Sequence, residues 1–351
     1  MARVLITRLS SFGDVAMLVP VVFSVAARYP QDRFVVLTRK AFAPLFENLG
    51  FNISAVTFDG EKQHKGFFGL LRLLRSVSRF GYSHVADVHD VLRTKIIRSY
   101  MGILGKNVAY IDKGKEDKQR MIDSKRTQPS LKHMTERYME VFEELGFPAE
   151  MVFNNFFEFK ERSLYPLRTI VTEKDTQWIG IAPFSKHEGK TYPTDKMEKV
   201  VKTLSERAST TIFLFGSGKY ERSLLDEWEN KYPNVKNVSG RINLMNELLL
   251  MSYLDVMISM DSANMHLASL VKTPVVSVWG ATHPNLGFYG YGQSINNAVL
   301  RDIECRPCSV YGEQPCIKGN YPCLTKLDES IILGKVEQIL CKKREGNWWV
   351  K

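Results

Sequence analysis

The sequence predicts an α/β fold of two units, each built from a parallel sheet covered by helices. Short apolar runs alternate with longer helical segments between Val4 and Leu104, and a second alternation of the same design begins at Trp178. Strands and helices that alternate at this spacing form parallel sheets with covered faces. The length of 351 residues accommodates two such units. Ligands of paired open sheets bind where the strands end, so a cleft between the units is the expected site.

The first unit is expected to begin with a strand, a polar loop and an apolar helix that ends at Arg28. In residues 66–80, leucines recur at helical spacing while Arg72, Arg75 and Arg79 stay on the exposed side. The expected strands are residues 4–7, 34–38, 53–58 and 85–88, and the further helices are a segment through Phe46, 66–80, 92–104 and 131–145.

Residues 113–132 interrupt this alternation. The stretch contains seven Lys or Arg residues and few apolar ones. Charge runs are usually solvated, so one interpretation is a surface loop. The other interpretation is a mobile basic flap that faces an anionic acceptor or lipid head groups. After the next helix, residues 147–166 are expected to link the two units.

The second unit repeats the design of the first. Its expected strands are residues 179–182, 211–215, 235–238, 256–260 and 275–278, and its expected helices are 195–207, 221–231, 244–253 and 263–270. Residues 328–343 have helical spacing and are expected to return to the first domain, and residues 348–351 are either an interfacial tail or disordered. The expected domains are 1–165 and 166–327, followed by the terminal segment 328–351.

Composition and charge narrow the class of protein. Hydrophobic residues make up 44% and charged residues 25%, which excludes a disordered, collagen-like or low-complexity chain. The net charge of +10 favours an anionic partner: nucleic acid, an anionic membrane surface or a phosphorylated metabolite. The apolar stretch 16–27 is too short for a membrane span and contains Pro20. With an odd number of five cysteines, a cytosolic protein is expected.

The loop after the first strand is a candidate catalytic element. Ser10, Ser11 and Gly13 are small enough to let a ligand approach the backbone, and Asp14 lies where the helix begins. An Asp at this position also caps a helix and complements its dipole, which is the structural alternative.

Two loops of the second unit carry candidate anion-binding residues. Asp261 ends a strand, and the N–H groups of Ser262 and Ala263 open the following helix, where an anion is favoured. His266 falls one turn further along; the alternative is a capped core helix with a satisfied histidine. Lys190, in the same loop as Ser185, is a suitable phosphate contact or an ordinary surface lysine.

Four cysteines follow with the spacing C-x2-C-x7-C-x6-C, at Cys305, Cys308, Cys316 and Cys323. A zinc ribbon needs two close pairs and only the first pair is close. Reduced thiols are therefore the favoured interpretation and a structural metal site the alternative. Neither unit contains an Asp-x-Asp pair of the kind that holds a sugar-nucleotide metal.

Taken together, these loops resemble glycosyltransferase family 9, the ADP-heptose:lipopolysaccharide heptosyltransferases. The resemblance spans nearly the whole chain and rests on residues 8–14 with Pro20 behind them, on 190–193 and on 261–268. Residues 278–282 and the cysteine loop also match the family's pattern. The family usually has Gly where this chain has Ala263. Because the backbone N–H makes that contact, the change is expected to be tolerated.

The resemblance implies a GT-B fold, in which an acceptor-binding and a nucleotide-sugar-binding Rossmann-like domain face each other across a cleft. It implies an inverting, metal-independent transfer of a heptose from ADP-heptose to a lipopolysaccharide inner-core acceptor, without a cofactor. Such an acceptor lies on the inner face of the cytoplasmic membrane, so the protein is expected to be cytoplasmic and peripheral, with the basic segment near the anionic surface.

The resemblance also assigns roles by position. Asp14 is expected to be the general base, in an acceptor loop with Ser10, Ser11 and Gly13. The donor site is expected to contain Lys190, Ser262 and Ala263 at the diphosphate, Asp261 at sugar hydroxyls, His266 in support, Gly216 and Glu221 near the nucleoside, and Ser185.

Three alternatives differ in class. One is a GT-B transferase that uses another nucleotide-sugar for another surface glycan. A second is a non-catalytic glycan-binding protein of the same fold, which has no chemical need for Asp14, Lys190 and Asp261 together. Nucleic-acid binding is disfavoured because the basic residues gather in one segment without an aromatic-basic platform that stacks bases.

Overall fold

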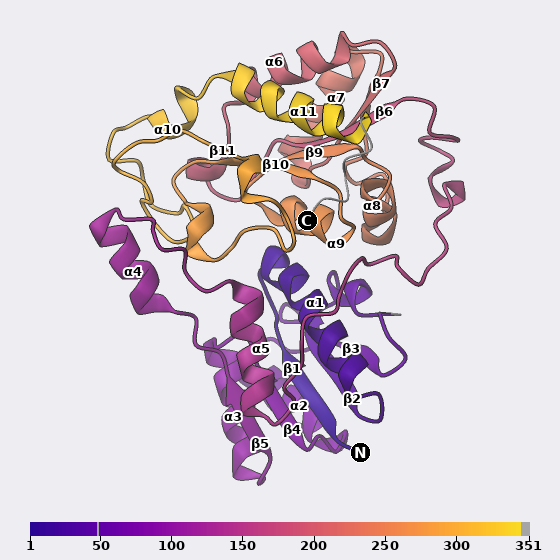
Figure 1. Ribbon diagram of the computed structural model, residues 1–351. Coiled ribbons are helices and arrows are strands. Elements are labelled where there is room, and N and C mark those ends of the chain that lie inside the picture. Colours follow the sequence, from indigo (N-terminus) through magenta and orange to yellow (C-terminus); the bar gives the residue numbers. More distant parts are fainter. Residues whose placement is uncertain (48, 345–351) are drawn as a thin grey trace. The chain divides into compact units, whose positions relative to one another are not determined.

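The computed structural model describes residues 1–47 and 49–344, which form two compact units (Figure 1). Unit 1 comprises Met1–Gly114 and Lys132–Phe156, and unit 2 comprises Lys115–Leu131 and the chain from Phe157 onward. The division therefore differs from the expected boundary after residue 165. The basic segment, although flanked by residues of unit 1, belongs to unit 2.

Unit 1 contains a five-stranded sheet in the order β3-β2-β1-β4-β5, and every neighbouring pair is parallel. The central strand pairs on both sides, with Leu5 opposite Val35 and Val85. Val4, Leu5 and Ile6 are fully buried, as expected of an apolar run covered on both faces. The strands are β1 (Arg3–Thr7), β2 (Arg33–Arg39), β3 (Ile53–Phe58), β4 (His84–Asp87) and β5 (Asn107–Tyr110).

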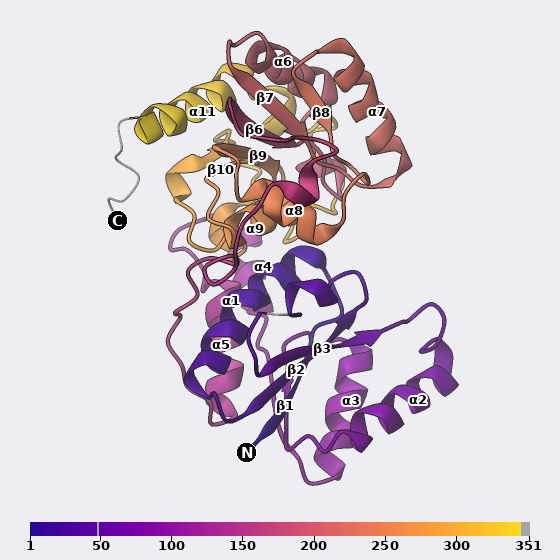
Figure 2. The same cartoon turned by 90° about the vertical axis from the view of Figure 1, so that its right-hand side faces the viewer.

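Helices cover both faces of this sheet (Figure 2). α1 (Phe12–Arg28) and α5 (Met134–Glu144) lie on one face, and α2 (Gly66–Arg79) and α3 (Leu92–Ile103) lie on the other. Past α5, Phe153 and Phe156 are buried, so the expected linker begins as part of the core of unit 1.

Unit 2 contains a six-stranded parallel sheet in the order β11-β10-β9-β6-β7-β8. The strands are β6 (Gln177–Ala182), β7 (Thr210–Leu214), β8 (Val235–Asn237), β9 (Val256–Met260), β10 (Val275–Trp279) and β11 (Ala298–Leu300). The helices are α4 (Lys115–Ser124), α6 (Thr194–Ser205), α7 (Gly218–Lys231), α8 (Leu244–Met251), α9 (Ala263–Leu270), α10 (Pro322–Thr325) and α11 (Glu329–Arg344). Two parallel-sheet α/β units are thus present, which confirms the predicted fold class.

The terminal helix α11 forms as predicted and packs in the core of unit 2. Ile332, Val336, Ile339 and Leu340 belong to the same apolar core as the inward side chains of α6 and α7. The apolar face of α11 is used within unit 2, and the expected return to the first domain stays a prediction. The predicted tail 348–351 lies outside the described residues.

Other elements also depart from the sequence-based predictions, among them α4 and α10, which were not predicted. The helix expected through Phe46 is a single 3-10 turn, η1 (Ala43–Leu45), with Pro44 in its first turn. The short edge strands β5 and β11 were not predicted, because each presents only one buried side chain. Within the described residues, 1–47 and 49–344, no helix is both long and apolar enough to cross a membrane.

Candidate active site

Asp14 lies in the first turn of α1 and is held by residues of its own loop. Its Oδ2 accepts hydrogen bonds from the Ser11 hydroxyl at 2.7 Å and the Ser11 N–H at 3.2 Å, and lies 2.5 Å from the Arg8 guanidinium. Burial opposes ionisation of the Asp14 carboxyl, but the Arg8 charge and the Ser11 hydrogen bonds outweigh burial and lower its pKa. The Asp14 carboxylate therefore caps α1, which is the structural role that the sequence left open, and it is also held in the ionised form.

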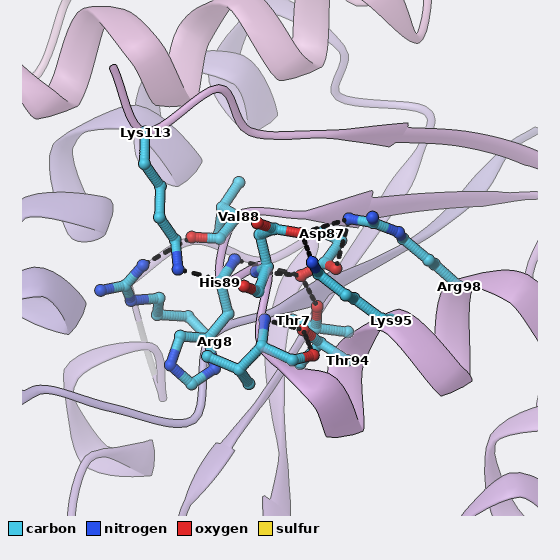
Figure 3. Close-up of polar contacts among 11 residues, drawn as sticks. Thr7, Arg8, Asp87, Val88, His89, Thr94, Lys95, Arg98 and Lys113 are labelled. Atoms are coloured by element: carbon cyan, nitrogen blue, oxygen red, sulfur yellow. Dashed lines mark hydrogen bonds and ion pairs between the residues drawn. The ribbon is translucent and has the colours of Figure 1, made fainter. Parts of the chain in front are cut away.

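The turn after β4 supports this loop and was not identified from the sequence (Figure 3). Asp87, fully buried, accepts hydrogen bonds from the Thr7 hydroxyl at 3.0 Å, the N–H groups of His89 and Asp90 at 3.1 and 2.9 Å, and Arg98 at 3.1 Å. Arg98 also reaches Asp90 at 2.9 Å. These contacts fix the chain path that places Val88 and His89 against the Asp14 loop.

His89 contacts the Asp14 loop directly. Its Nδ1 accepts the Leu9 N–H at 3.4 Å, and its Nε2 lies 3.3 Å from the Ser10 hydroxyl. Burial, with the Arg8 and Lys113 charges, lowers the pKa of His89 to about 3, so the ring is neutral. Since Nδ1 accepts, the proton lies on Nε2, which donates to Ser10. Arg8 is anchored from the same turn because its guanidinium donates to the Val88 carbonyl at 2.7 Å.

In unit 2, Lys190 and Asp261 form an ion pair with a separation of 3.0 Å between Nζ and Oδ2. The Thr282 hydroxyl donates to the same Asp261 oxygen at 2.7 Å, and the Ser185 hydroxyl donates to the Asp261 carbonyl at 3.2 Å. The side chains of Lys190 and Asp261 are only 15% and 8% exposed. Three loops that follow β6, β9 and β10 therefore meet at the carboxyl edge of the sheet.

The start of α9 completes this group. Ser262 is its N-cap, with the hydroxyl 3.2 Å from that of Ser259, and Ala263 is its first residue. His266 is buried one turn along α9. The structure therefore brings Ser185, Lys190 and Asp261 into contact, with the helix start at Ser262 and Ala263 adjoining Asp261 in the chain.

Gly216 and Glu221 lie at the carboxyl end of β7. The Glu221 carboxylate accepts the Ser217 N–H at 2.6 Å and so caps its own helix, α7. The Gly216 carbonyl accepts a hydrogen bond from the Ser239 hydroxyl at 2.6 Å. Among the described residues, neither Gly216 nor Glu221 forms a hydrogen bond or ion pair with Lys190 or Asp261, and the nucleoside role of these two residues stays a prediction.

The four cysteines of the 305–323 loop are free thiols in the structure. Burial raises the pKa of Cys308 to about 11 and also raises that of Cys323. In the part of the chain that the structure describes, no group of three or more His, Cys, Asp or Glu side chains is arranged to hold a metal ion. Arg306 lies between Cys305 and Cys308 in the sequence, and its side chain is buried. Its guanidinium donates to the carbonyl of Thr282 at 2.8 Å and so supports the residue whose hydroxyl binds Asp261.

The basic segment is not a solvated loop throughout, because part of it is helical, although residues 125–130 are irregular and mostly exposed; the flap interpretation stays a prediction. The segment forms α4 and packs on unit 2, where the buried Lys118 ammonium lies 4.2 Å from the centre of the Phe288 ring. Lys125 donates to the Pro307 carbonyl at 2.9 Å, and Leu131 N–H donates to the Asn285 carbonyl at 2.9 Å. Two of its seven basic side chains, Lys118 and Lys125, therefore fasten the segment beside loops of unit 2.

Comparison with known families decides the assignment of the chain. Residues 70–317 match the family model described as glycosyltransferase family 9 (heptosyltransferase). The chain belongs to glycosyltransferase family 9. Lys190, Asp261 and His266 lie within the matched residues of this family 9 glycosyltransferase, whereas Asp14 precedes them.

Individual relatives agree with this assignment. The family 9 enzyme is 22% identical over 324 residues to the lipopolysaccharide core heptosyltransferase OpsX of Haemophilus influenzae, covering 88% of this chain and 84% of OpsX. Its fold is similar to that of E. coli ADP-heptose lps heptosyltransferase II, with a TM-score of 0.71, 16% identity, and coverage of 98% and 100% of the two chains. It is also similar to E. coli heptosyltransferase WaaC with ADP, with a TM-score of 0.68, 17% identity, and coverage of 96% and 99%.

A glycine contact in the family 9 enzyme positions the Lys190 loop, and we expect Gly280→Ala to be destabilising. A Cβ at Gly280 would lie 2.2 Å from the carbonyl oxygen of Gly189. In urea unfolding, the free energy of unfolding of Gly280→Ala should be lower by about 1–3 kcal/mol, which is the usual cost of overpacking. The matched control is Gly334→Ala, where a Cβ meets nothing within 4 Å on α11. There, stability should rise by up to about 1 kcal/mol; an equal loss in both variants would contradict the explanation.

Proposed function

We propose that this glycosyltransferase transfers a heptose from ADP-heptose to the inner core of lipopolysaccharide, with inversion and without a metal ion or other cofactor. The family description and the names of the E. coli neighbours support this donor and acceptor class. The observation that carries the proposal is the Lys190–Asp261 pair, which adjoins the start of α9 in unit 2.

In this proposal, unit 2 binds the donor and stabilises its leaving group. Lys190 and the N–H groups of Ser262 and Ala263 hold the diphosphate, since a cation and a helix start both favour an anion. Asp261 accepts hydrogen bonds from sugar hydroxyls, and Ser185 and His266 support it. Gly216 and Glu221 contact the nucleoside. Electrostatic stabilisation of the departing diphosphate supplies the larger part of the catalysis.

Unit 1 supplies the base and binds the acceptor through Ser10, Ser11 and Gly13. Asp14 takes the proton of the acceptor hydroxyl, the hydroxyl oxygen forms the bond to the anomeric carbon, and the bond from that carbon to the diphosphate breaks with its electrons leaving on ADP. Because the Arg8 and Ser11 contacts occupy Oδ2, we assign Oδ1 of Asp14 as the oxygen that takes the proton.

A nucleotide screen tests the donor assignment. Thermal unfolding of the protein is measured with ADP, UDP, GDP and NAD, followed by mass analysis of heptose-free lipopolysaccharide incubated with ADP-heptose. We expect selective stabilisation by ADP, and a mass gain of one heptose that persists with EDTA. Selective stabilisation by UDP or GDP would overturn the donor, and loss of transfer with EDTA would overturn metal independence.

The Arg8 contact predicts a change in the pH dependence of transfer. Asp14 acts as a base only when ionised, and Arg8 lowers its pKa, so activity should persist on the acid side. In Arg8→Gln the pKa of Asp14 rises and the acid limb of kcat/KM should move to higher pH. Arg8→Lys keeps the charge and should stay near the parent profile. The control is Arg33→Gln, at the start of β2; an unshifted limb in Arg8→Gln would contradict the base assignment.

A further inference from the structure

The first turns of α2 present an exposed apolar surface on unit 1. Phe67 and Phe68 are 70% and 80% exposed, and their rings contact each other edge to face at 5.8 Å. Leu71, one turn further on, is 38% exposed. The opposite side of the helix is already used, because Leu73, Leu74 and Val77 are buried in the core of unit 1. We name Phe67, Phe68 and Leu71 the α2 tip.

Basic side chains surround the α2 tip. From Lys62 to Ala86 the chain has five Lys or Arg residues and no Asp or Glu. The five are exposed and are Lys62, Lys65, Arg72, Arg75 and Arg79. Arg72, Arg75 and Arg79 follow Phe68 at positions four, seven and eleven, so they form one stripe along the helix.

The preceding loop holds the tip in an ordered turn. A Cβ at Gly69 would lie 2.3 Å from the carbonyl carbon of His64, so the helix packs closely on the loop at this glycine. His64 stacks on Phe58 with ring centres 5.4 Å apart, and Arg72 donates to the Gln63 carbonyl at 3.1 Å. Figure 2 shows α2 beside α3 at an edge of unit 1, with this loop projecting away from the sheet.

We propose that the α2 tip and its basic residues bind the surface of an anionic lipid bilayer. Exposed aromatic side chains flanked by Lys and Arg are typical of helices that lie in the interface, with the apolar groups at the head-group boundary and the cations at lipid phosphates. A second copy of the chain is disfavoured as the occupant, because a symmetric contact would bring two sets of five like charges together.

This inference rests on the proposed function only in the choice of a lipid-linked acceptor. It moves the membrane contact from residues 113–132, where Lys118 and Lys125 are engaged within unit 2, to a surface that none of the residues proposed for catalysis occupies. Binding to lipid and transfer of sugar can therefore be measured separately.

Vesicle co-sedimentation of the full-length protein tests the proposal. Phosphatidylcholine vesicles are compared with vesicles that also contain phosphatidylglycerol, and we expect binding to the anionic vesicles that weakens with salt. Phe67→Ser/Phe68→Ser should lower the partition coefficient at least about tenfold. The triple variant Arg72→Gln/Arg75→Gln/Arg79→Gln should lower the partition coefficient by about 100-fold, because each cation near an anionic surface contributes about a fivefold factor.

The matched control is Tyr220→Ser/Ile317→Ser, which removes two exposed apolar residues of unit 2, 73% and 84% exposed, and should bind as the parent does. Stabilisation by ADP and transfer to a delipidated acceptor should be unchanged in both α2 variants, which shows that they fold. Parent-like vesicle binding by the α2 variants would overturn the proposal. So would dimerisation in solution that is lost in Phe67→Ser/Phe68→Ser. Absence of transfer by the parent would overturn the proposed function alone.

Discussion

Replacing Asp14 with Asn is expected to lower the rate of heptose transfer by about 10²–10⁴-fold, the usual contribution of a positioned base. The amide keeps the size of the side chain but cannot take the proton of the acceptor hydroxyl. Because the proposed donor contacts belong to unit 2, stabilisation by ADP should be the same as in the parent protein. Single-turnover transfer and ADP-dependent thermal unfolding measure the two effects separately.

The buried Arg8 makes a second variant necessary, since Asp14→Asn leaves its guanidinium without a counter-charge. Removing one partner of a buried ion pair costs about 3–5 kcal/mol, and the side chains of this pair are only 6% and 15% exposed. The double variant Arg8→Gln/Asp14→Asn restores the charge balance and should recover stability but not activity. Recovery of both would show that Asp14 has a structural role only.

Replacing Lys190 with Met is expected to weaken ADP binding and to lower kcat/KM by about 10²–10³-fold, as for other single groups that stabilise a leaving anion. The Lys190 ammonium is held by Asp261 and is 15% exposed, so it is positioned and largely desolvated before the diphosphate binds. Calorimetric titration with ADP and steady-state kinetics provide the measurements.

Lys186→Met is the matched control for this effect. Lys186 is in the same loop but is exposed, and it should show near-parental affinity for ADP. A double-mutant cycle with Asp261→Asn separates the two roles, because loss of Asp261 should affect kcat with a nucleotide-sugar more than it affects ADP binding. Parental ADP affinity in Lys190→Met would remove Lys190 from the donor site.

The central strands of both sheets could be predicted from the sequence, and so could the two loops that carry Lys190 and Asp261. β1 and β9 are apolar runs that are buried on both faces, so hydrophobic pattern alone identifies them. Asp261 was predictable because a polar residue that ends a buried strand and precedes a helix points to the carboxyl edge of a sheet. The ion pair with Lys190 follows from a fold in which their loops meet.

Other features depend on contacts that a local pattern does not contain. Asp87 also ends a strand, but its importance arises from hydrogen bonds with Thr7, which is 80 residues away in the sequence, and with Arg98 of the following helix. α4 has a polar composition, and its buried Lys118 lies against Phe288 of a distant loop. The support that Thr282 and Arg306 give to Asp261 likewise depends on loops brought together by the fold.

Because residues 115–131 belong to unit 2, the backbone connects the two units more than once. The backbone passes from one unit to the other after Gly114, after Leu131 and after Phe156. A single cut therefore cannot divide the protein into two complete halves, and a fragment that starts at Phe157 would lack the helix that shields Phe288. The two units are therefore joined by three backbone connections, so the units exchange chain segments and are not consecutive halves of the sequence.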